Sequence, residues 1–361
     1  MQSKFLVKFL TITVLVFSLN LNAQHIEYEV SEGNDEERDI KTEIKESINH
    51  HIQDSYDFIF FSDTEKNKHY GFSLPVILID EGLHLFSSSK FHHGETVAES
   101  NGKYYKLYHN KIYRTDAEGT LSLDDHQHPT NIKPLDFSIT KGVLMIMVTG
   151  ALMLLLFVGL ARSFGKGPIA TGAGRFFEPI IVYIRDDIAR PNIGETKYKK
   201  YMPYLLTVFF FVWFLNLFGL TPLGVNVTGN IAVTFALAII TFIITQFSGN
   251  KNYWKHIFWM PGVPVPMKFI LAPIELLGVF IKPFALMIRL YANIMAGHVV
   301  LMSIIGLVFI FQNWIGGALS LFLAFFLSII ELLVAALQAY IFTLLSALYF
   351  GFAVEEHDEA H

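Results

Sequence analysis

The chain contains 361 residues, of which 52% are hydrophobic and 16% charged, and its mean hydropathy is +0.42. This composition excludes an ordinary soluble protein of this length and predicts an all-α polytopic membrane protein with a small additional module. Because the sequence has no cysteine, it excludes disulfide bonds, thiol catalysis and zinc sites built on cysteine, and we expect no cofactor.

Charge divides the chain into two parts. Residues 24–136 hold 22 acidic and 11 basic residues, whereas residues 137–353 hold 6 acidic and 14 basic ones. The first part is therefore expected in water and the second in lipid. The exposed part is acidic and offers no basic patch for phosphates, which argues against nucleic-acid binding.

Residues 1–23 have the pattern of a secretory signal peptide. Lys4 and Lys8 provide a positive start, an apolar run follows from Phe9 to Phe17, and Ala23 is a small residue suited to cleavage. The run is too short to cross about 30 Å of hydrocarbon, and an uncleaved first anchor is the alternative. The residues that follow are then expected to begin in the periplasm.

Residues 24–137 predict an acidic periplasmic module. Between Asp39 and Ile59, isoleucines recur every four residues, which is the spacing of one stripe on an amphipathic helix. The stripe consists of Ile40, Ile44, Ile48 and Ile52. Residues 70–122 instead carry short β-like runs separated by glycines, so we expect several strands there.

The same module holds ten histidines, which raises the question of a metal site. The candidate ligands are His126 with His128, and the pairs His50-His51 and His92-His93. Their spacing matches no known ligand pattern, and exposed histidine in an aqueous segment is ordinary. We therefore expect no metal.

Residues 138–353 predict the membrane domain. Three apolar stretches of spanning length are followed by two of more than 30 residues, and together they cover residues 142–161, 202–220, 227–247, 269–304 and 317–353. At about 1.5 Å per residue, each of the last two would reach roughly 50 Å, well beyond the hydrocarbon core. They must therefore be kinked, for which Pro273 and Pro283 offer positions, or steeply tilted against a partner.

The loops between these stretches predict the orientation. Residues 162–201 carry eight Lys and Arg residues, and Lys251, Lys255 and Lys268 mark a second basic loop. Both loops are expected in the cytoplasm, in agreement with an exported N-terminus. The odd number of spans then leaves the acidic tail, residues 354–361, in the cytoplasm.

Ionisable and amide side chains interrupt the last two stretches. The first of the two holds Glu275, Lys282, Arg289, Asn293 and His298, and the second holds Glu331 and Gln338. An ionised side chain at the centre of a bilayer costs about 2.5–3.5 kcal/mol, so such groups face water, a partner or each other. Their spacing of seven and four residues predicts a polar seam on each helix, and the two seams together would line an internal polar path.

Arg289 is the least easily explained of these residues. A static ion pair or snorkelling to the interface explains Glu275 and Lys282 equally well, but Arg289 lies too far from either end of its helix to snorkel. Histidine and a buried carboxylate exchange protons near neutral pH, whereas arginine does not. A fixed cation beside His298 therefore suggests a proton path with a barrier in it.

Residues 282–298 read Lys-Pro-Phe-Ala-Leu-Met-Ile-Arg-Leu-Tyr-Ala-Asn-Ile-Met-Ala-Gly-His. This segment resembles subunit a of rotary F-type ATP synthases, which has an Arg-Leu-Phe-Gly-Asn-Met-x-Ala-Gly stretch. Tyr291 and Ala292 replace the Phe and Gly of that stretch. The resemblance extends to residues 214–217, 226–228 and 337–342 and covers about residues 135–356. Residues 48–51 resemble an N-terminal stretch of the family, while residues 60–130 look like an insertion.

The resemblance implies a proton-translocating stator subunit of the bacterial inner membrane, with two aqueous half-channels that couple proton flow to rotation and ATP synthesis. Its last two helices would form a tilted hairpin against a ring of c subunits, and its other partners would be b-type stator subunits, further synthase subunits and the lipid bilayer. No nucleotide site is expected, since Gly165-Lys166-Gly167 lacks the features of a P-loop. The alternatives are a secondary ion transporter or proton channel that works without a rotor, and a simple membrane anchor.

The resemblance also implies roles for single residues. Arg289 would face the ring carboxylate with Gln338 beside it, and Asn293 and Asn216 would line the half-channels. Glu275 and Lys282 are expected to line a channel because they belong to the polar seam. His298 and Glu331 stand, in exchanged order, where family members have a Glu and a His, which implies a proton relay pair. Gly219 stands where the family often has Asp, a departure in the lining of one half-channel.

Overall fold

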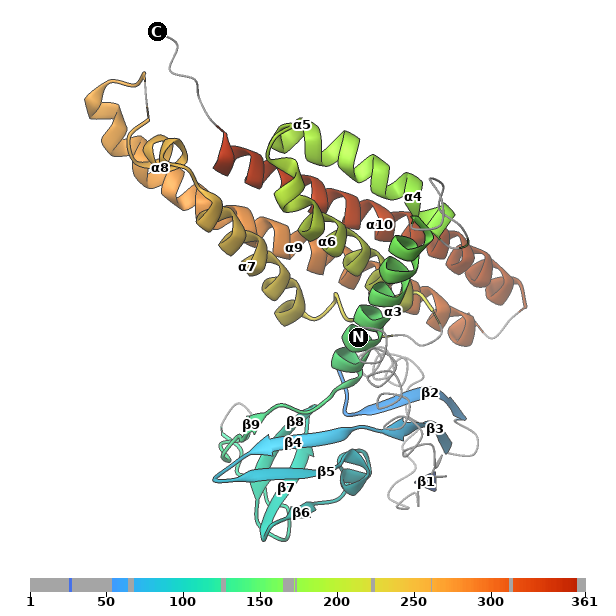
Figure 1. Ribbon diagram of the computed structural model, residues 1–361. Helices are drawn as coiled ribbons and strands as arrows, with labels where there is room; N and C mark the ends of the chain where they lie inside the picture. Colours follow the sequence, from blue (N-terminus) through green and yellow to red (C-terminus); the bar gives the residue numbers. More distant parts are fainter. Residues whose placement is uncertain are drawn as a thin grey trace. The chain divides into compact units, whose positions relative to one another are not determined.

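The computed structural model describes residues 26–27, 54–63, 68–124, 128–164, 172, 174–221, 225–260, 262–311 and 314–355. They fall into a strand-rich unit that ends at Leu144 and a helical unit that begins at Met145, which are treated separately below (Figure 1). The expected signal peptide, the isoleucine stripe, His50, His51 and His126 lie outside the described residues.

The described residues of the strand-rich unit form three antiparallel sheets of three strands each. Their orders are β1-β3-β2, β5-β4-β9 and β6-β7-β8. The strands are β1 (Ile26–Glu27), β2 (Asp57–Asp63), β3 (Lys68–Ser73), β4 (Pro75–Ile79), β5 (Leu83–Ser87), β6 (Ala98–Ser100), β7 (Lys103–Tyr108), β8 (Lys111–Thr115) and β9 (Leu135–Asp136). A 3₁₀ helix, η1 (Ser88–Gly94), follows β5. The strands expected over residues 70–122 are thus confirmed.

Alternation of side chains along the strands builds the core of this unit. Val76 and Leu78 of β4 are fully buried, as are Tyr105 of β7 and Ile112 of β8, while their neighbours along each strand point the other way. Phe91 of η1 packs edge to face on Phe86 at 5.5 Å between ring centroids.

The helix expected up to Ile59 is wrong at its end. Residues 57–59 belong to β2, where Asp57 pairs with Ser73 and Phe58 with Phe72. The rings of Phe58 and Phe72 stack at 5.2 Å, and this cross-strand contact favours the extended form over a local helical pattern.

Among the described residues, five helices are long and apolar enough to cross a membrane, as the sequence predicts. They are α3 (Lys141–Phe164), α6 (Tyr198–Gly219), α7 (Ile231–Ser248), α9 (Val265–Phe311) and α10 (Trp314–Val354). The N-terminus of α7 lies four residues later than the stretch 227–247 suggests, because Asn230 caps the helix by accepting a hydrogen bond from the N–H of Ala232 at 3.0 Å.

The two basic segments expected as loops also contain helices. Residues 162–201 include α4 (Gly174–Tyr183), a π-helical stretch η2 (Ile184–Ala189) and α5 (Arg190–Ile193), and α8 (Lys251–Phe258) lies in the second segment. Ile184, Ile188 and Ile193 of the first segment are buried in the core that α6 and α10 help to form. The spacing of apolar residues in this segment indicates a helix, but the many Lys and Arg residues favoured a loop.

Helices α9 and α10 are the long elements, with 47 and 41 residues, and they pack side by side (Figure 1). Pro273 and Pro283 lie inside α9 without ending it. At 1.5 Å per residue both helices exceed roughly 60 Å, about twice the hydrocarbon thickness. Their length therefore requires tilt or extension beyond the bilayer.

Candidate functional site

A histidine and a glutamate meet between the two long helices. Nδ1 of His298 in α9 lies 2.9 Å from Oε1 of Glu331 in α10. The two residues are only 6% and 7% exposed. The two atoms lie within ion-pair distance, although neither Nδ1 of His298 nor an oxygen of Glu331 has a hydrogen-bond partner of ordinary geometry among the described residues. An imidazole and a carboxylate this close form a pair between which a proton can pass.

Two glycines make room for this pair. A Cβ added at Gly219 of α6 would lie 3.2 Å from Nε2 of His298, and one at Gly297 would lie 3.0 Å from Oε1 of Glu331. Both distances are tighter than ordinary contacts. The departure at Gly219 noted in the sequence thus has a steric reason, because the imidazole occupies the space beside it.

A small cavity adjoins the pair. It measures about 10 Å³ and is lined by Asn216, Asn226, Thr228, His298 and Glu331 together with apolar groups. The Thr228 hydroxyl donates to Oδ1 of Asn216 at 2.7 Å, and Oδ1 of Asn226 accepts from the N–H of Gly229 at 2.8 Å. The Nδ2 groups of both asparagines are buried without a hydrogen-bond partner among the described residues. The cavity is thus lined by donors and acceptors able to hold a proton carrier.

A hydrogen bond between two side-chain amides also joins α9 and α10. Nδ2 of Asn293 donates to Oε1 of Gln338 at 3.0 Å, and Gln338 is 1% exposed. Gln338 is therefore held against α9.

Arg289 itself lies on the exposed face of α9. No ion pair or hydrogen bond joins its guanidinium to another described residue. The expected seam forms only in part: Asn293 contacts Gln338 of α10, whereas Lys282 and Arg289 have exposed side chains and Glu275 is half-buried. An apolar stripe decides which face packs inward, and it consists of Val279, Leu286, Leu290 and Ile294.

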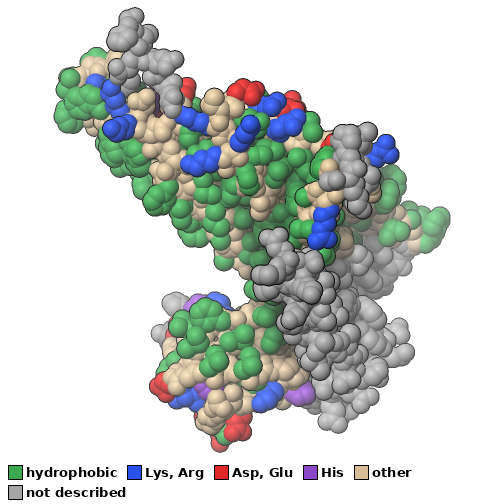
Figure 2. Space-filling view, in the orientation of Figure 1, with side chains coloured by type: hydrophobic (Ala, Val, Ile, Leu, Met, Phe, Trp, Pro, Cys, Tyr) green, Lys and Arg blue, Asp and Glu red, His purple; other side chains and the backbone are tan. Residues whose placement is uncertain are grey.

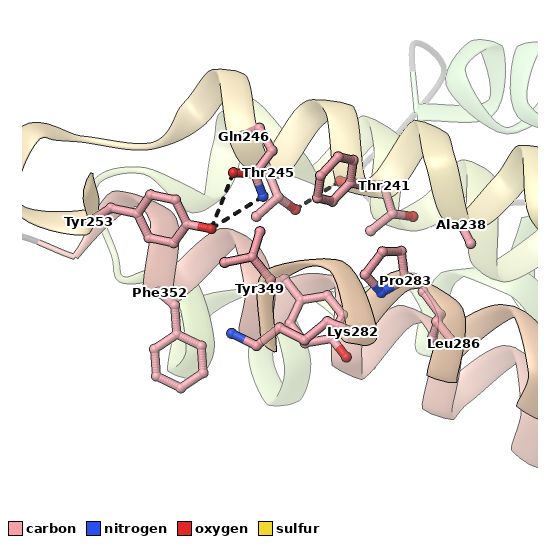
Figure 3. A pocket seen from close by; sticks show the side chains of 12 residues that line it. Ala238, Thr241, Thr245, Gln246, Tyr253, Lys282, Pro283, Leu286, Tyr349 and Phe352 are labelled. Carbon is pink, nitrogen blue, oxygen red and sulfur yellow. Dashed lines mark hydrogen bonds between the residues drawn. The ribbon is translucent and has the colours of Figure 1, made fainter. Parts of the chain in front are cut away.

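A larger cavity of about 650 Å³ lies beside residues 275–282 of α9. Glu275 and Lys282 line it, and Lys255, His256 and Glu355 contribute further charged or titratable groups from α8 and the end of α10. Lys282 also lines a small neighbouring pocket between α7, α9 and α10 (Figure 3). There its ammonium group lies 5.8 Å from the ring centroid of Tyr349 and 5.7 Å from that of Phe352.

The structure thus brings together His298 with Glu331 and Asn293 with Gln338, and it places Asn216 in the cavity beside the first pair. Sequence reasoning missed Asn226 and Thr228 as lining residues. The sequence Asn-Val-Thr at residues 226–228 contributes to the resemblance but does not by itself indicate a cavity. It also missed His256, which one basic loop contributes to the larger cavity.

Comparisons with known proteins match both parts of the chain. The family model for the ATP synthase A chain matches residues 143–351, and a model described as a domain of unknown function (DUF8433) matches residues 47–137. The ATP synthase subunit a of Chloroherpeton thalassium is 42% identical over 65% of this chain and 73% of its own length. ATP synthase subunit a 2 of Chlorobaculum tepidum is 42% identical over 65% of this chain and 68% of its own length. The subunit a of Pelodictyon phaeoclathratiforme is 44% identical over 64% of this chain and 72% of its own length.

Proposed function

The chain belongs to the ATP synthase A chain family, and we propose how its own residues divide the work of moving protons. As a subunit a, it is the proton-translocating membrane subunit of the stator in a bacterial F-type ATP synthase and works with the other subunits of that enzyme. Family membership sets aside a transporter without a rotor and a simple anchor. One observation carries the proposal: a buried His298–Glu331 pair lies on the same helix pair as an exposed Arg289 that has no counter-ion among the described residues.

The cavity at His298 and Glu331 is the inner end of the inlet half-channel. Protons from the periplasm reach the pair past Asn216, Asn226 and Thr228, whose amides and hydroxyl supply donors and acceptors. Both nitrogen atoms of the His298 imidazole can bind a proton, and the Glu331 carboxylate lies 2.9 Å from one of them. The pair then delivers the proton to a carboxylate on the ring of c subunits.

Arg289 is the fixed counter-ion of that ring carboxylate. A guanidinium that faces hydrocarbon without a partner is costly, so its exposed position on α9 favours a surface that receives an acid from another chain. A protonated carboxyl group can turn into lipid with the ring, whereas an ionised one cannot, because burial of an unpaired charge costs too much. When the ring carboxyl returns to Arg289, the guanidinium favours its ionised form and the proton leaves.

The cavity lined by Glu275 and Lys282 is the outlet half-channel to the cytoplasm. It is wide enough for many water molecules, and Lys255 and His256 extend its polar lining along α8. Charged side chains keep such a passage hydrated.

Arg289 separates the two half-channels. Along α9 it follows Lys282 by seven residues and precedes His298 by nine, which corresponds to roughly 10 Å and 13 Å of helix. A permanent cation between the two cavities repels a proton that would cross directly. Each proton that falls through the membrane potential yields about 2.3 kcal/mol per 100 mV, which the ring converts into torque.

The proposal includes an orientation and partners. Basic segments around α4 and α8 support a cytoplasmic position for these helices, with the strand-rich unit in the periplasm and the C-terminus in the cytoplasm. The hairpin of α9 and α10 is tilted against the ring of c subunits, and b-type stator subunits hold the chain against rotation.

Replacement of Arg289 tests the proposal. Arg289→Ala should abolish proton-driven ATP synthesis in membrane vesicles, while the ATP-hydrolysing sector remains bound and a ring of small hairpin subunits still copurifies. Lys268→Ala is the control, since Lys268 lies near the start of α9 against the Trp259 ring at 4.5 Å. Wild-type synthesis rates in the Arg289→Ala vesicles would contradict the assignment.

A further inference from the structure

One face of the β5-β4-β9 sheet is apolar although the strand-rich unit is acidic. Val76, Leu78 and Phe86 point into the core, and the side chains that alternate with them point outward. The outward set is Ile77, Ile79, Leu83, Leu85, Leu135 and Phe137, of which Leu83, Leu85, Leu135 and Phe137 are 63–66% exposed. A sheet face in contact with water normally carries polar side chains at these positions.

Pairing across the three strands makes these residues neighbours. Ile77 lies opposite Leu85, and Ile79 lies between Leu83 on one side and Leu135 on the other. Phe137 follows through the hydrogen bond from its N–H to the carbonyl of Ile77. Hydrophobic side chains gather over β4 and β5 in Figure 2. This set, hereafter the apolar sheet face, is one contiguous surface without a charged member.

The apolar sheet face is joined firmly to the beginning of a membrane helix. The N–H of Ile139 donates to the carbonyl of Pro75 at 3.1 Å, and the Ser138 hydroxyl accepts from the N–H of Ile77 at 3.0 Å. Asp54 then holds the first turn of α3, accepting from the N–H of Gly142 at 3.0 Å and from the Thr140 hydroxyl at 2.7 Å. Lys141 follows Phe137 by four positions, which limits the distance between their Cα atoms to about 14 Å.

We propose that the apolar sheet face inserts into the interfacial layer of the lipid bilayer on the side where α3 enters it. The short, hydrogen-bonded connection keeps this face within reach of the lipid boundary, whatever other chains are present. An uncharged, contiguous apolar surface gains free energy when it leaves water for the boundary of the acyl chains. The strand-rich unit would thereby brace the outer end of α3.

The absence of cysteine allows a direct test, because one introduced cysteine is the sole labelling site. The full-length chain with Leu85→Cys is labelled with an environment-sensitive nitrobenzoxadiazole dye and placed in phosphatidylcholine vesicles. Nitroxide-bearing lipids then report contact by quenching. Leu83→Cys is the second position, and Glu118→Cys, on an exposed turn after β8, is the matched control.

We expect blue-shifted emission and loss of at least half of the fluorescence at positions 83 and 85, with little change at position 118. Water-like emission without quenching at positions 83 and 85 would overturn the proposal. So would protection without lipid quenching, which means that a protein segment covers the face. Formation of a disulfide bond between two copies of the unlabelled Leu85→Cys chain, in place of quenching, identifies a second copy as the occupant and overturns it as well.

Discussion

Gly219 of α6 and His298 of α9 approach so closely that a Cβ on the glycine would lie 3.2 Å from Nε2 of the imidazole. The imidazole of His298 therefore depends on the absence of a side chain at position 219. A side chain at position 219 would have no room beside His298 in this rotamer. The same holds for Gly297, whose added Cβ would lie 3.0 Å from the Glu331 carboxylate.

Alanine at either glycine should therefore slow proton translocation. Overpacking costs about 1–3 kcal/mol, which corresponds to roughly a 5- to 150-fold lower rate if all of it falls on the relay step. Gly297→Ala should be the more severe change, since its contact is shorter. The measurement is ATP-driven proton pumping in inverted vesicles.

Gly278→Ala is the control for both glycine variants. Gly278 also lies in α9, but nothing lies within 4 Å of the position its Cβ would take. Equal rates in all three variants would show that the space beside His298 and Glu331 is not limiting.

The exchange of His298 and Glu331 should preserve function better than the loss of either residue. His298→Glu alone places two carboxylates in contact, and Glu331→His alone places two imidazoles there, so each single variant should lose roughly 10-fold or more in rate. The double variant again has one acid and one imidazole at these two positions and should recover most of the activity. ATP synthesis driven by an imposed pH gradient measures all three.

This comparison also separates a shared proton from two independent roles. If the residues act independently, the losses of the single variants multiply and the double variant is the weakest of the three. That result would contradict the relay pair.

Thr228→Val should lower the rate by a smaller factor. The change removes the hydroxyl that donates to Oδ1 of Asn216 at 2.7 Å and leaves the shape of the side chain almost unchanged. A neutral hydrogen bond contributes about 0.5–1.5 kcal/mol, equal to roughly a 2- to 12-fold change in rate. Pumping assays with the intact enzyme measure it.

Thr245→Val provides the comparison for Thr228. Thr245 is likewise buried, but its hydroxyl donates only to the carbonyl of Thr241 in its own helix. An equal effect of the two changes would mean that the Asn216 contact has no special part in the inlet.

The five spanning helices could be predicted from the sequence because each is a long apolar run, and lipid selects for composition before packing matters. The His298–Glu331 pair was also within reach, since the resemblance suggested that the two residues exchange places. Their contact at 2.9 Å depends on how α9 and α10 pack, which spacing along one helix does not specify.

The exposed position of Arg289 could not be predicted from the spacing of residues in the sequence. Spacings of seven residues put Glu275, Lys282 and Arg289 on one side of α9, but they do not determine which side of the helix faces α10. The stripe of Val279, Leu286 and Leu290 decides this by filling the interface with apolar volume. The helix predicted at residues 57–59 was wrong for a related reason. These residues form a strand because they pair with β3, which lies further along the chain.

Tyr56→Phe should loosen the strand-rich unit without touching the membrane helices. Tyr56 is 6% exposed, and its hydroxyl donates to the carboxylate of Asp136 at the end of β9. Because a hydrogen bond to a charged group contributes about 1.5–3 kcal/mol, amide exchange at β4 and β9 should accelerate roughly 10- to 150-fold in the full-length chain. Hydrogen–deuterium exchange with mass spectrometry measures this, and Tyr113→Phe is the control, since its hydroxyl bonds no other described residue. If both variants exchange at the same rate, the Tyr56 hydroxyl does not hold β9 in place.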